Sequence, residues 1–268
     1  MSNITEQPSR HRHLETKTVE EITSLINQED ATVAEAIRKA LPQVNALIEA
    51  IVTKLSNGGR MFYLGAGSGG RLSVLDIIEL PTTYGIDKGI VNTILAGGVE
   101  HLVEAREEME DNFNEGWERL VKQNVSVSDI VIGISASGTT PFVLGALEAC
   151  RRTGITTGCI VSNPNAPISE QADYPVEVIT GPEFITGSTR MKCGTAQKML
   201  FDMISTTTMI RLGRVDDNQM VNVLLINKKI TDRAVKMLMQ KAGIDEYEKA
   251  KELLLKHGSV KNAVEHFK

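Results

Sequence analysis

The sequence predicts an α/β protein: a parallel five-stranded sheet flanked by helices, with further helices at both ends of the chain. Three observations lead to this fold class. Short apolar, β-branched runs alternate with helical segments, two of those runs are followed by turns rich in glycine and hydroxyl residues, and both ends of the chain have helical periodicity. Such alternation is typical of βαβ units whose parallel sheet is covered on both faces.

The N-terminal part is expected to be helical. Apolar residues recur at i, i+3, i+7 and i+11, which places them on one helical face: Val44, Leu47, Ile51 and Leu55. Pro42 is expected to break or kink the helix and to separate it from an earlier turn that carries Val33 and Ile37. The glycines at 58 and 59 should end the helix, because glycine tolerates the left-handed cap.

Five strands are then expected, at residues 60–64, 90–95, 129–134, 156–161 and, more weakly, 175–179. Helices are expected between and after them, at residues 71–78, at roughly 100–123, from Pro141 onward, at 189–212, and in the Lys-, Glu- and Leu-rich remainder. This pattern divides the chain into an N-terminal helical segment (1–50), a central α/β domain (51–214) and a C-terminal helical segment (215–268).

Composition excludes several classes of protein. The 268 residues are 41% apolar, enough to bury one sizeable core. The net charge of −5 and the aromatic content of 4% argue against nucleic-acid binding. Neither a signal-peptide pattern nor an apolar run of about 18 residues is present, so we expect a cytoplasmic protein with no membrane partner.

The cysteine and histidine residues suggest no metal chemistry. Cys150, Cys159 and Cys193 follow no ligand spacing, and a sparse, odd cysteine count fits a reduced protein. The histidines likewise form no HxxxH motif or carboxylate pair. We therefore expect neither a metal site nor a cofactor.

Two turns, at residues 65–70 and 135–140, each follow a strand and open a helix. Glycine lets the backbone approach a ligand closely, and the free N–H groups of a first helical turn attract an anion. The candidate phosphate ligands in these turns are Gly67, Ser68, Gly69, Ser135, Ser137, Thr139 and Thr140. Ligands of open parallel sheets bind beyond the carboxyl ends of the strands at the switch point, which these turns flank in the strand order 2-1-3-4-5.

Other interpretations of these turns stay open at this point. The same residue types also make ordinary tight turns and helix N-caps. Residues 65–70 match GxGxxG, yet the second strand has no acid near its end until Glu100, so the partner expected in a dinucleotide site is missing. Two such turns at neighbouring strand ends favour phosphate.

Candidate acids and cations come from three further stretches. Glu79 follows an apolar run, where an acid either caps a neighbour or has a raised pKa suited to donating a proton. Glu107, Glu110 and Asp111 would share one helical face, and the residues alone do not choose among them. Residues 186–192 open another helix, where Ser188 and Lys192 are candidates to bind and neutralise phosphate, or belong to a surface turn.

Five ordered blocks of this sequence resemble N-acetylmuramic acid 6-phosphate etherases. They are GAGSGGRL at 65–72, LDIIELPTTYG at 75–85, AGG at 96–98, SASGTTP at 135–141 and TGSTRMKCGTAQK at 186–198. The resemblance extends from about residue 14 to about residue 230. It implies the sugar isomerase (SIS) fold, a parallel five-stranded α/β sandwich, and kinship with the glucokinase regulatory protein.

The resemblance also implies a reaction, in which the D-lactyl ether of N-acetylmuramic acid 6-phosphate is cleaved to N-acetylglucosamine 6-phosphate and D-lactate. This reaction serves peptidoglycan recycling and amino-sugar catabolism. By position in the matching blocks, the family's proton donor falls on Glu79 and its second catalytic acid on Glu110. We assign Glu79 as acid and Glu110 as base, with the reverse assignment left open. SIS relatives imply a homodimer, with residues 190–198 near its interface.

The sequence departs from the family at two places. Ser68-Gly69 stands where Thr-Ser is usual, so a hydroxyl is missing at Gly69, and the surroundings of Glu79 are more apolar than usual. Two other functions from the same fold stay open, a sugar-phosphate isomerase and a non-catalytic sugar-phosphate sensor. The presence of both Glu79 and Glu110 argues against the sensor.

Overall fold

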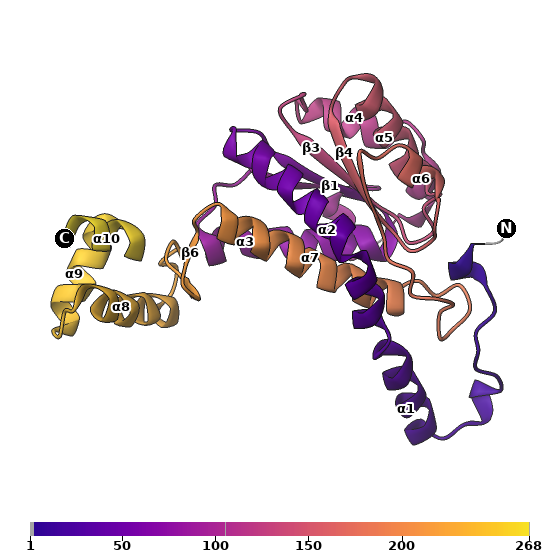
Figure 1. Cartoon of the computed structure of the whole chain (residues 1–268), viewed down its shortest axis with the longest axis horizontal. Coiled ribbons are helices and arrows are strands. Elements are labelled where there is room, and N and C mark those ends of the chain that lie inside the picture. The colour runs from indigo at the N-terminus through magenta and orange to yellow at the C-terminus, as the bar shows by residue number, and fades with distance from the viewer. Residues whose placement is uncertain (1–2, 105, 268) are drawn as a thin grey trace. The chain divides into compact units, whose positions relative to one another are not determined.

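The computed structural model describes residues 3–104 and 106–267 and contains the expected parallel sheet (Figure 1). Its strands are β1 (Met61–Gly65), β2 (Val91–Leu95), β3 (Ile130–Ile134), β4 (Thr156–Val161) and β5 (Tyr174–Glu177). They pair in the order β2-β1-β3-β4-β5, and each pairing is parallel. The α/β fold class and the strand order are thus confirmed.

The centre of the sheet is buried on both faces, which is why β1 and β3 are made almost entirely of apolar residues and glycine. Every residue of β1 and β3 is buried. On one face, Phe62 and Leu64 join a core cluster with side chains of α5 (Pro141–Arg152) and α4 (Glu115–Lys122). On the other face, Tyr63 packs against Phe201 of α7 (Lys192–Arg211), with ring centroids 5.0 Å apart.

Helix α2 (Val33–Ser56) includes Pro42, so the expected separation of residues 33–37 from the rest of the helix is wrong. A proline inside a helix costs roughly 3 kcal/mol, because one backbone hydrogen bond is lost and the ring crowds the preceding turn. The buried face of α2 continues on both sides of Pro42, from Ile37 to Val44 and Leu47, and this packing offsets the cost. The helix ends at the predicted place, and Gly58 has a φ of 81°.

The charged region 100–123 is not one helix, which is a second correction. It consists of two short 3-10 turns, Val99–His101 and Glu107–Asp111, followed by α4. Gly97 and Gly98 have positive φ, and residues 102–104 and 106–108 are exposed, so no apolar stripe holds a helix against the core.

The helices α3 (Gly67–Tyr84), α5 and α6 (Pro167–Glu170) follow β1, β3 and β4, as expected for βαβ units. Helix α1 (Val19–Asp30) precedes α2, and its capping box joins Thr18 and Glu21. After α7, a short hairpin that the sequence did not predict, β6 (Val215–Asp216) with β7 (Gln219–Met220), leads to α8 (Lys228–Ala242), α9 (Tyr247–His257) and α10 (Val260–Phe267).

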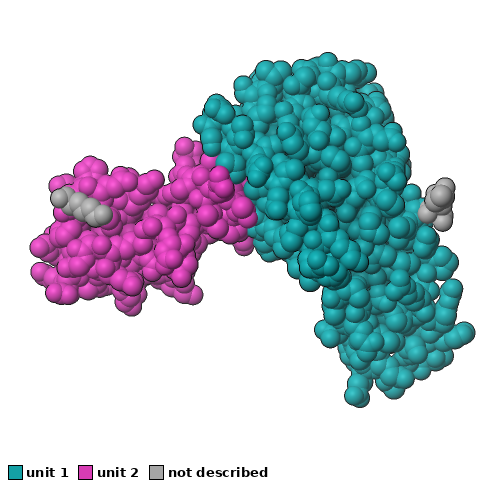
Figure 2. Space-filling model, in the orientation of Figure 1, with its two compact units in different colours: residues 1–76, 89–204 teal, residues 77–88, 205–268 magenta. Residues whose placement is uncertain are grey.

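The chain groups into two compact units, coloured separately in Figure 2. The first comprises Met1–Asp76 and Gly89–Ile204, and so joins the N-terminal helices to the sheet. The second comprises Ile77–Lys88 and Ser205–Lys268, with a small core of its own that includes Val235, Leu238 and Leu254. These groupings differ from the predicted boundaries at 50/51 and 214/215.

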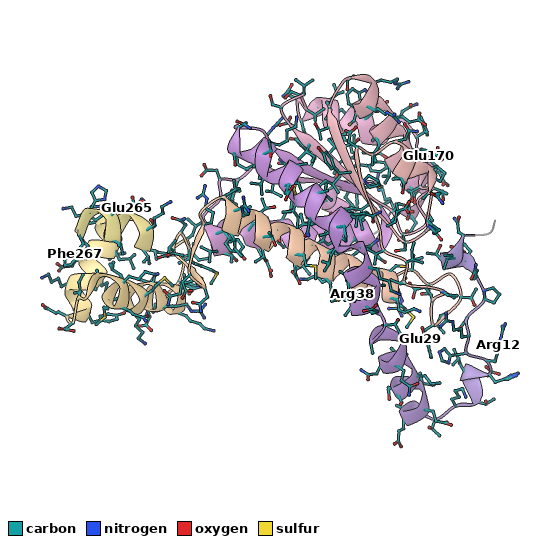
Figure 3. All side chains as sticks on the ribbon, viewed as in Figure 1. Arg12, Glu29, Arg38, Glu170, Glu265 and Phe267 are labelled. Atoms are coloured by element: carbon teal, nitrogen blue, oxygen red, sulfur yellow. The ribbon has the colours of Figure 1, made fainter. Side chains whose placement is uncertain are left out.

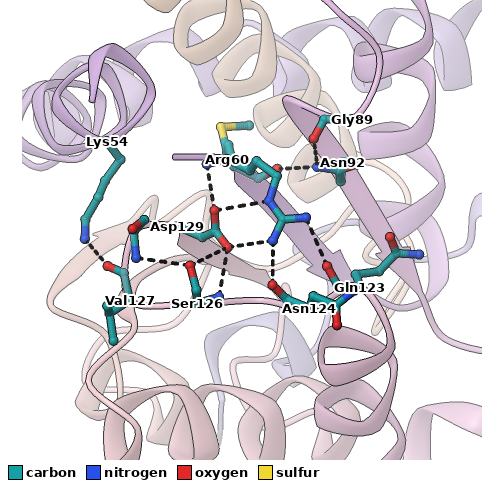
Figure 4. Close-up of polar contacts among 11 residues, drawn as sticks. Lys54, Arg60, Gly89, Asn92, Gln123, Asn124, Ser126, Val127 and Asp129 are labelled. Atoms are coloured by element: carbon teal, nitrogen blue, oxygen red, sulfur yellow. Dashed lines mark hydrogen bonds and ion pairs between the residues drawn. The ribbon is translucent and has the colours of Figure 1, made fainter. Parts of the chain in front are cut away.

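Two polar networks in the first unit fasten its elements. At the amino ends of β1 and β3, the Asp129 carboxylate accepts hydrogen bonds from the Arg60 amide (2.8 Å) and guanidinium (2.8 Å to Nη2) (Figure 4). Glu29, which Figure 3 labels at the end of α1, contacts His11 (3.0 Å) and the ammonium group of Lys192 (2.5 Å).

Among the helices of residues 3–104 and 106–267, none has both the length and the apolar character needed to cross a membrane. Within the same residues, no group of three or more His, Cys, Asp and Glu side chains is placed to hold a metal ion.

Candidate active site

A cavity of about 240 Å³ lies where β1 and β3 end, and both predicted turns line it. Six of the candidate phosphate ligands in these turns line it: Gly67, Ser68, Gly69, Ser135, Ser137 and Thr140. Glu110 lines it as well, and all of these residues belong to the first unit. Two stretches far apart in the sequence thus meet at the carboxyl edge of the sheet, as expected for an open parallel sheet.

The turn after β1 brings backbone close to the cavity. Helix α3 begins at Gly67, whose φ of +53° suits glycine, and a Cβ there would lie 3.3 Å from Glu110 Oε1. The N–H groups in the first turn of a helix have no intrahelical acceptor and attract an anion. Ser68 adds a hydroxyl to this wall of the cavity.

The turn after β3 presents hydroxyl groups that hold one another in place. The buried Ser135 Oγ lies 2.8 Å from Thr140 Oγ1 and 3.3 Å from Ser137 Oγ, and it accepts a hydrogen bond from the Gly138 amide at 3.0 Å. Helix α5 begins directly after Thr140, with a proline as its first residue. This cluster of hydroxyls beside a helix N-terminus suits the oxygens of a phosphate group.

Glu110 differs from the acids around it because its pKa is raised. Burial, together with a hydrogen bond to Glu107 and the charge of Glu107, raises the pKa of Glu110 to about 7. The pKa of Glu107 is lowered, by the same hydrogen bond with Glu110 and by the hydrogen bond from Arg71. The Arg71 Nη2 atom lies 2.5 Å from Glu107 Oε1. The pair therefore holds one exchangeable proton near neutral pH, which suits a general acid or base.

Several predicted residues do not line the cavity. Thr139 and Ser188 are not among the residues that line it. Thr189, the neighbour of Ser188, lines it. Lys192 is 2% exposed and pairs with Glu29, while its amide donates to the buried Glu183 carboxylate at 2.9 Å. These contacts favour a structural role for Lys192.

Glu79 lies in the part of α3 that groups with the second unit, and its side chain is exposed. It is not among the residues that line the cavity. The exposed side chain of Leu75 (42%) lies one turn before it on the same helical face, at i−4, and the exposed side chain of Ile78 (59%) directly precedes it in the sequence.

The cavity is also lined by residues that were not among the predicted ligands, including Arg71, Gln197 and Glu6. Gln197 is 2% exposed, and its Oε1 atom has no hydrogen-bond partner within the described residues. Glu6 is brought there by an N-terminal arm whose buried Thr5 bonds to Asn163 (3.2 Å from the Thr5 amide). Arg71 and Gln197 stand inside the blocks that carry the resemblance, which is the signal that marks them.

Comparison with known proteins supports the same interpretation of the sheet. The model for the glucokinase regulatory protein N-terminal SIS domain matches residues 43–151, and the SIS domain model matches residues 114–206. Among solved structures, two phosphoheptose isomerases share the fold. The one from Francisella tularensis has a TM-score of 0.53 and 16% identity, and the match covers 75% of this chain and 100% of that one. The one from Neisseria gonorrhoeae has a TM-score of 0.52 and 15% identity, and the match covers 71% of this chain and 98% of that one.

Curated relatives are much more similar over nearly the whole chain. An N-acetylmuramic acid 6-phosphate etherase from Bacteroides fragilis is 52% identical over 99% of this chain and 94% of its own length. The etherase from Porphyromonas gingivalis strain ATCC 33277 is 53% identical over 99% of this chain and 96% of its own. On this similarity, the chain belongs to the family of N-acetylmuramic acid 6-phosphate etherases.

Proposed function

We propose that this protein is a carbon–oxygen lyase that converts N-acetylmuramic acid 6-phosphate into N-acetylglucosamine 6-phosphate and D-lactate, as the names of its relatives suggest. The observation that carries the proposal is a single cavity in which two anion-binding turns stand beside Glu110, a carboxyl group with a pKa of about 7. Such a cavity combines donors for a phosphate with a group that can move a proton.

The first half of the reaction is an elimination. In the open-chain sugar the C2–H bond is acidified by the C1 aldehyde, and the lactyl ether oxygen leaves from C3. Glu110, as its carboxylate, takes the C2 proton. The C3–O bond then breaks with its electron pair going to oxygen, which is protonated as D-lactate departs, and an aldehyde with a C2=C3 double bond remains.

The second half adds water across that double bond. The water oxygen bonds to C3 and a proton returns to C2, so the overall change is the hydrolysis of an ether with no oxidation or reduction. Each proton transfer by a positioned side chain contributes ~10²–10⁴-fold to the rate. Binding energy from the distant phosphate is available to orient the reacting carbons.

We assign protonation of the ether oxygen to Glu79 and place it in the site of a partner subunit of a homodimer. Glu79 is exposed and is not among the residues that line the cavity of its own chain. The exposed apolar side chains beside Glu79, Leu75 and Ile78, suit contact with a second copy.

We place the reaction in the cytoplasm. The three cysteines, Cys150, Cys159 and Cys193, are free thiols, and burial raises the pKa of each (to about 12, 11 and 12). Free cysteines without disulfides are typical of a reducing compartment.

The test is to incubate the purified protein with N-acetylmuramic acid 6-phosphate in water enriched in deuterium and ¹⁸O. We expect release of D-lactate, with deuterium at C2 and ¹⁸O at C3 of the product sugar. The variant Glu110→Gln should lose nearly all activity, whereas Glu108→Gln, which changes an exposed neighbour outside the cavity, should keep it.

Three results would contradict the proposal. Absence of D-lactate would exclude the etherase, and interconversion of aldose and ketose phosphates in its place would indicate an isomerase. Appearance of ¹⁸O in the lactate would mean that the bond on the other side of the ether oxygen breaks. Near-normal turnover by Glu110→Gln would remove Glu110 from the mechanism.

A further inference from the structure

The proposed substrate carries two anions, a phosphate on C6 and the carboxylate of its lactyl group. The hydroxyls and helix N-termini of the two turns account for the first of them. We propose that Arg71 binds the lactyl carboxylate, and so distinguishes the ether from sugar phosphates that lack this group. This inference rests on the proposed function.

Arg71 is the only cationic side chain among the described residues that line the cavity. It lies one helical turn beyond Gly67 on α3, and its side chain is 31% exposed. Other charges in the lining are the carboxylates of Glu6, Glu107 and Glu110. A cation favours a carboxylate ligand in such a site, and among the described lining residues Arg71 supplies it.

The position of Arg71 agrees with the connectivity of the substrate. Its guanidinium contacts Glu107, which shares a hydrogen bond with Glu110, and the charge of Arg71 itself acts on Glu110. If Glu110 removes the proton on C2, the ether oxygen on C3 is close by. The lactyl carboxylate is only two bonds beyond that oxygen, which brings it within reach of Arg71.

The Arg71 guanidinium also has N–H groups that can donate hydrogen bonds to a ligand. Arginine carries five N–H groups in a planar fork that suits a carboxylate, and one nitrogen of Arg71, Nη2, contacts Glu107. No other hydrogen bond of this side chain forms within the described part of the chain. Arg71 is thus able to keep Glu107 and to receive the substrate on its remaining donors.

A narrower recess beside the cavity adds further positive charge. Arg71, Glu107 and Glu110 line it too, together with His101 and Arg106. No ion pair or hydrogen bond of the Arg106 side chain forms within the described residues. A second cation next to Arg71 favours an anionic group at this end of the site over a neutral one.

The experiment compares two ligands in two proteins. One ligand is the substrate, and the other is its analogue in which the lactyl carboxylate is a primary amide; their binding is measured with the wild type and with Arg71→Gln. We expect the wild type to prefer the carboxylate by ~10–100-fold, the range of a charge-assisted hydrogen bond. Arg71→Gln should lose this preference, and Arg71→Lys, which keeps the charge without the fork, should retain part of it.

Two controls distinguish carboxylate binding by Arg71 from a purely structural role of this side chain. Inhibition by N-acetylglucosamine 6-phosphate, which has no lactyl group, should be the same in Arg71→Gln as in the wild type, and this also reports an intact fold. A residue that only positioned Glu107 would change the pH profile of the reaction and leave the carboxylate preference intact. That result, or equal weakening of both ligands, would overturn the inference.

The proposed function has its own separate readout in the same experiment. If the wild type releases no D-lactate, the etherase proposal fails, whatever Arg71 binds. If it releases D-lactate while Arg71→Gln still prefers the carboxylate ligand, only the role of Arg71 is wrong.

Discussion

Glu107 and Glu110 show how two neighbouring carboxyl groups acquire different pKa values. Burial penalises the charged form of Glu110, and the adjacent Glu107 carboxylate makes a second negative charge more costly, so the pKa of Glu110 rises to about 7. Glu107 remains ionised because it accepts hydrogen bonds from Glu110 and from Arg71. An acid with a pKa close to neutrality changes its protonation state at little cost, which is what a catalytic base requires.

This arrangement predicts the effect of pH. With Glu110 as the base, kcat/KM should rise with pH through about 7, because the carboxylate is the active form. The variant Glu107→Gln removes the negative neighbour, so the pKa of Glu110 should fall and the acidic limb should move to lower pH. The measurement is a pH profile of lactate release, with Glu108→Gln as the matched control. A limb that moves to higher pH would contradict the assigned coupling.

Gly69 lacks the hydroxyl that is usual at this position in the family, and the neighbouring Gln197 explains why the site tolerates the change. A Cβ at Gly69 would lie 2.8 Å from Ile134 Cγ2 and 2.9 Å from Gln197 Oε1, so the Gln197 amide occupies the space that a larger residue would need. Gln197 is buried and its Oε1 atom has no partner within the described residues, which leaves it available to a sugar hydroxyl.

Substitution of Gly69 should therefore disturb ligand binding. We expect Gly69→Ala to displace Gln197 and to raise KM by about tenfold, the effect of losing one or two hydrogen bonds. The matched control is Gly194→Ala in α7, where the nearest atom to an added Cβ is 3.8 Å away. Steady-state kinetics of both variants test this, and an unchanged KM for Gly69→Ala would show that Gln197 does not hold the substrate.

The sequence predicted the site residues that lie in its two turns more successfully than the isolated ones. Ser135, Ser137 and Thr140 stand in one short stretch with a physical reason to bind phosphate, and they line the cavity. Gln197 comes from a helical pattern in which a polar side chain by itself gives no sign of the cavity it faces, and only the matching block at residues 186–198 marks it. Lys192 has the positive charge expected of a phosphate ligand, but its ammonium group binds Glu29, which is 163 residues away in the sequence.

At the scale of elements, apolar runs predicted the central strands well because β1 and β3 are buried at every residue, whereas the edge strands β2 and β5 are partly buried. The errors arose where long-range packing or loop geometry decides the outcome. Pro42 is kept inside α2 by the buried face that extends to either side of it. The acidic stretch before α4 had helical spacing, yet without burial in residues 102–104 that spacing has nothing to pack against, and Glu107–Asp111 forms a 3-10 turn.

The Arg60–Asp129 pair predicts an effect on stability without one on catalysis. Asp129 is 2% exposed and also accepts a hydrogen bond from the Ser126 amide at 2.9 Å, and this network fastens the amino ends of β1 and β3 (Figure 4). Asp129→Ala should lower the free energy of unfolding by about 2–3 kcal/mol, because buried donors lose their acceptor. The catalytic cavity lies at the carboxyl ends of the strands, so kcat should stay unchanged.

Thermal melting and lactate release test this prediction together. The melting temperature should fall by roughly 5–10 °C. Burial would raise the pKa of Asp129, yet the hydrogen bonds from Arg60 and Ser126 lower it overall, so its stabilising effect is present above the unfolded-state pKa and is lost in acid. The difference in melting temperature between the variant and the wild type should therefore shrink at low pH. If Asp129→Ala lost as much activity as Arg71→Gln or Glu110→Gln, the prediction that this network does not affect catalysis would be wrong.

At the scale of the whole molecule, the boundary between units was not visible in the sequence. Helices α3 and α7 each contribute residues to both units, and the segment Ile77–Lys88 groups with Ser205–Lys268 far along the chain. No linker composition marks such a division, because the elements that cross it are regular helices. The proposed homodimer is equally hidden from sequence patterns, and it rests in part on the exposed side chains of Leu75 and Ile78.

The proposed homodimer predicts how two inactive variants behave when they are mixed. Glu79→Gln and Glu110→Gln should each be nearly inactive. If Glu79 of one subunit serves the cavity of the other, a mixed dimer has one site with both substitutions and one site with neither. After the subunits exchange, half of the dimers are mixed, so about one quarter of the wild-type rate of lactate release should return.

Two further measurements make the result decisive. Light scattering should give the mass of a dimer for both variants, and the recovered rate should increase with the time allowed for exchange. Recovery requires that the two glutamates act across an interface, because no exchange of subunits restores a site whose residues come from one chain. If the mixture remains as inactive as its components while the mixed dimer is present, both glutamates act within one chain, and the placement of Glu79 in the partner's site is wrong.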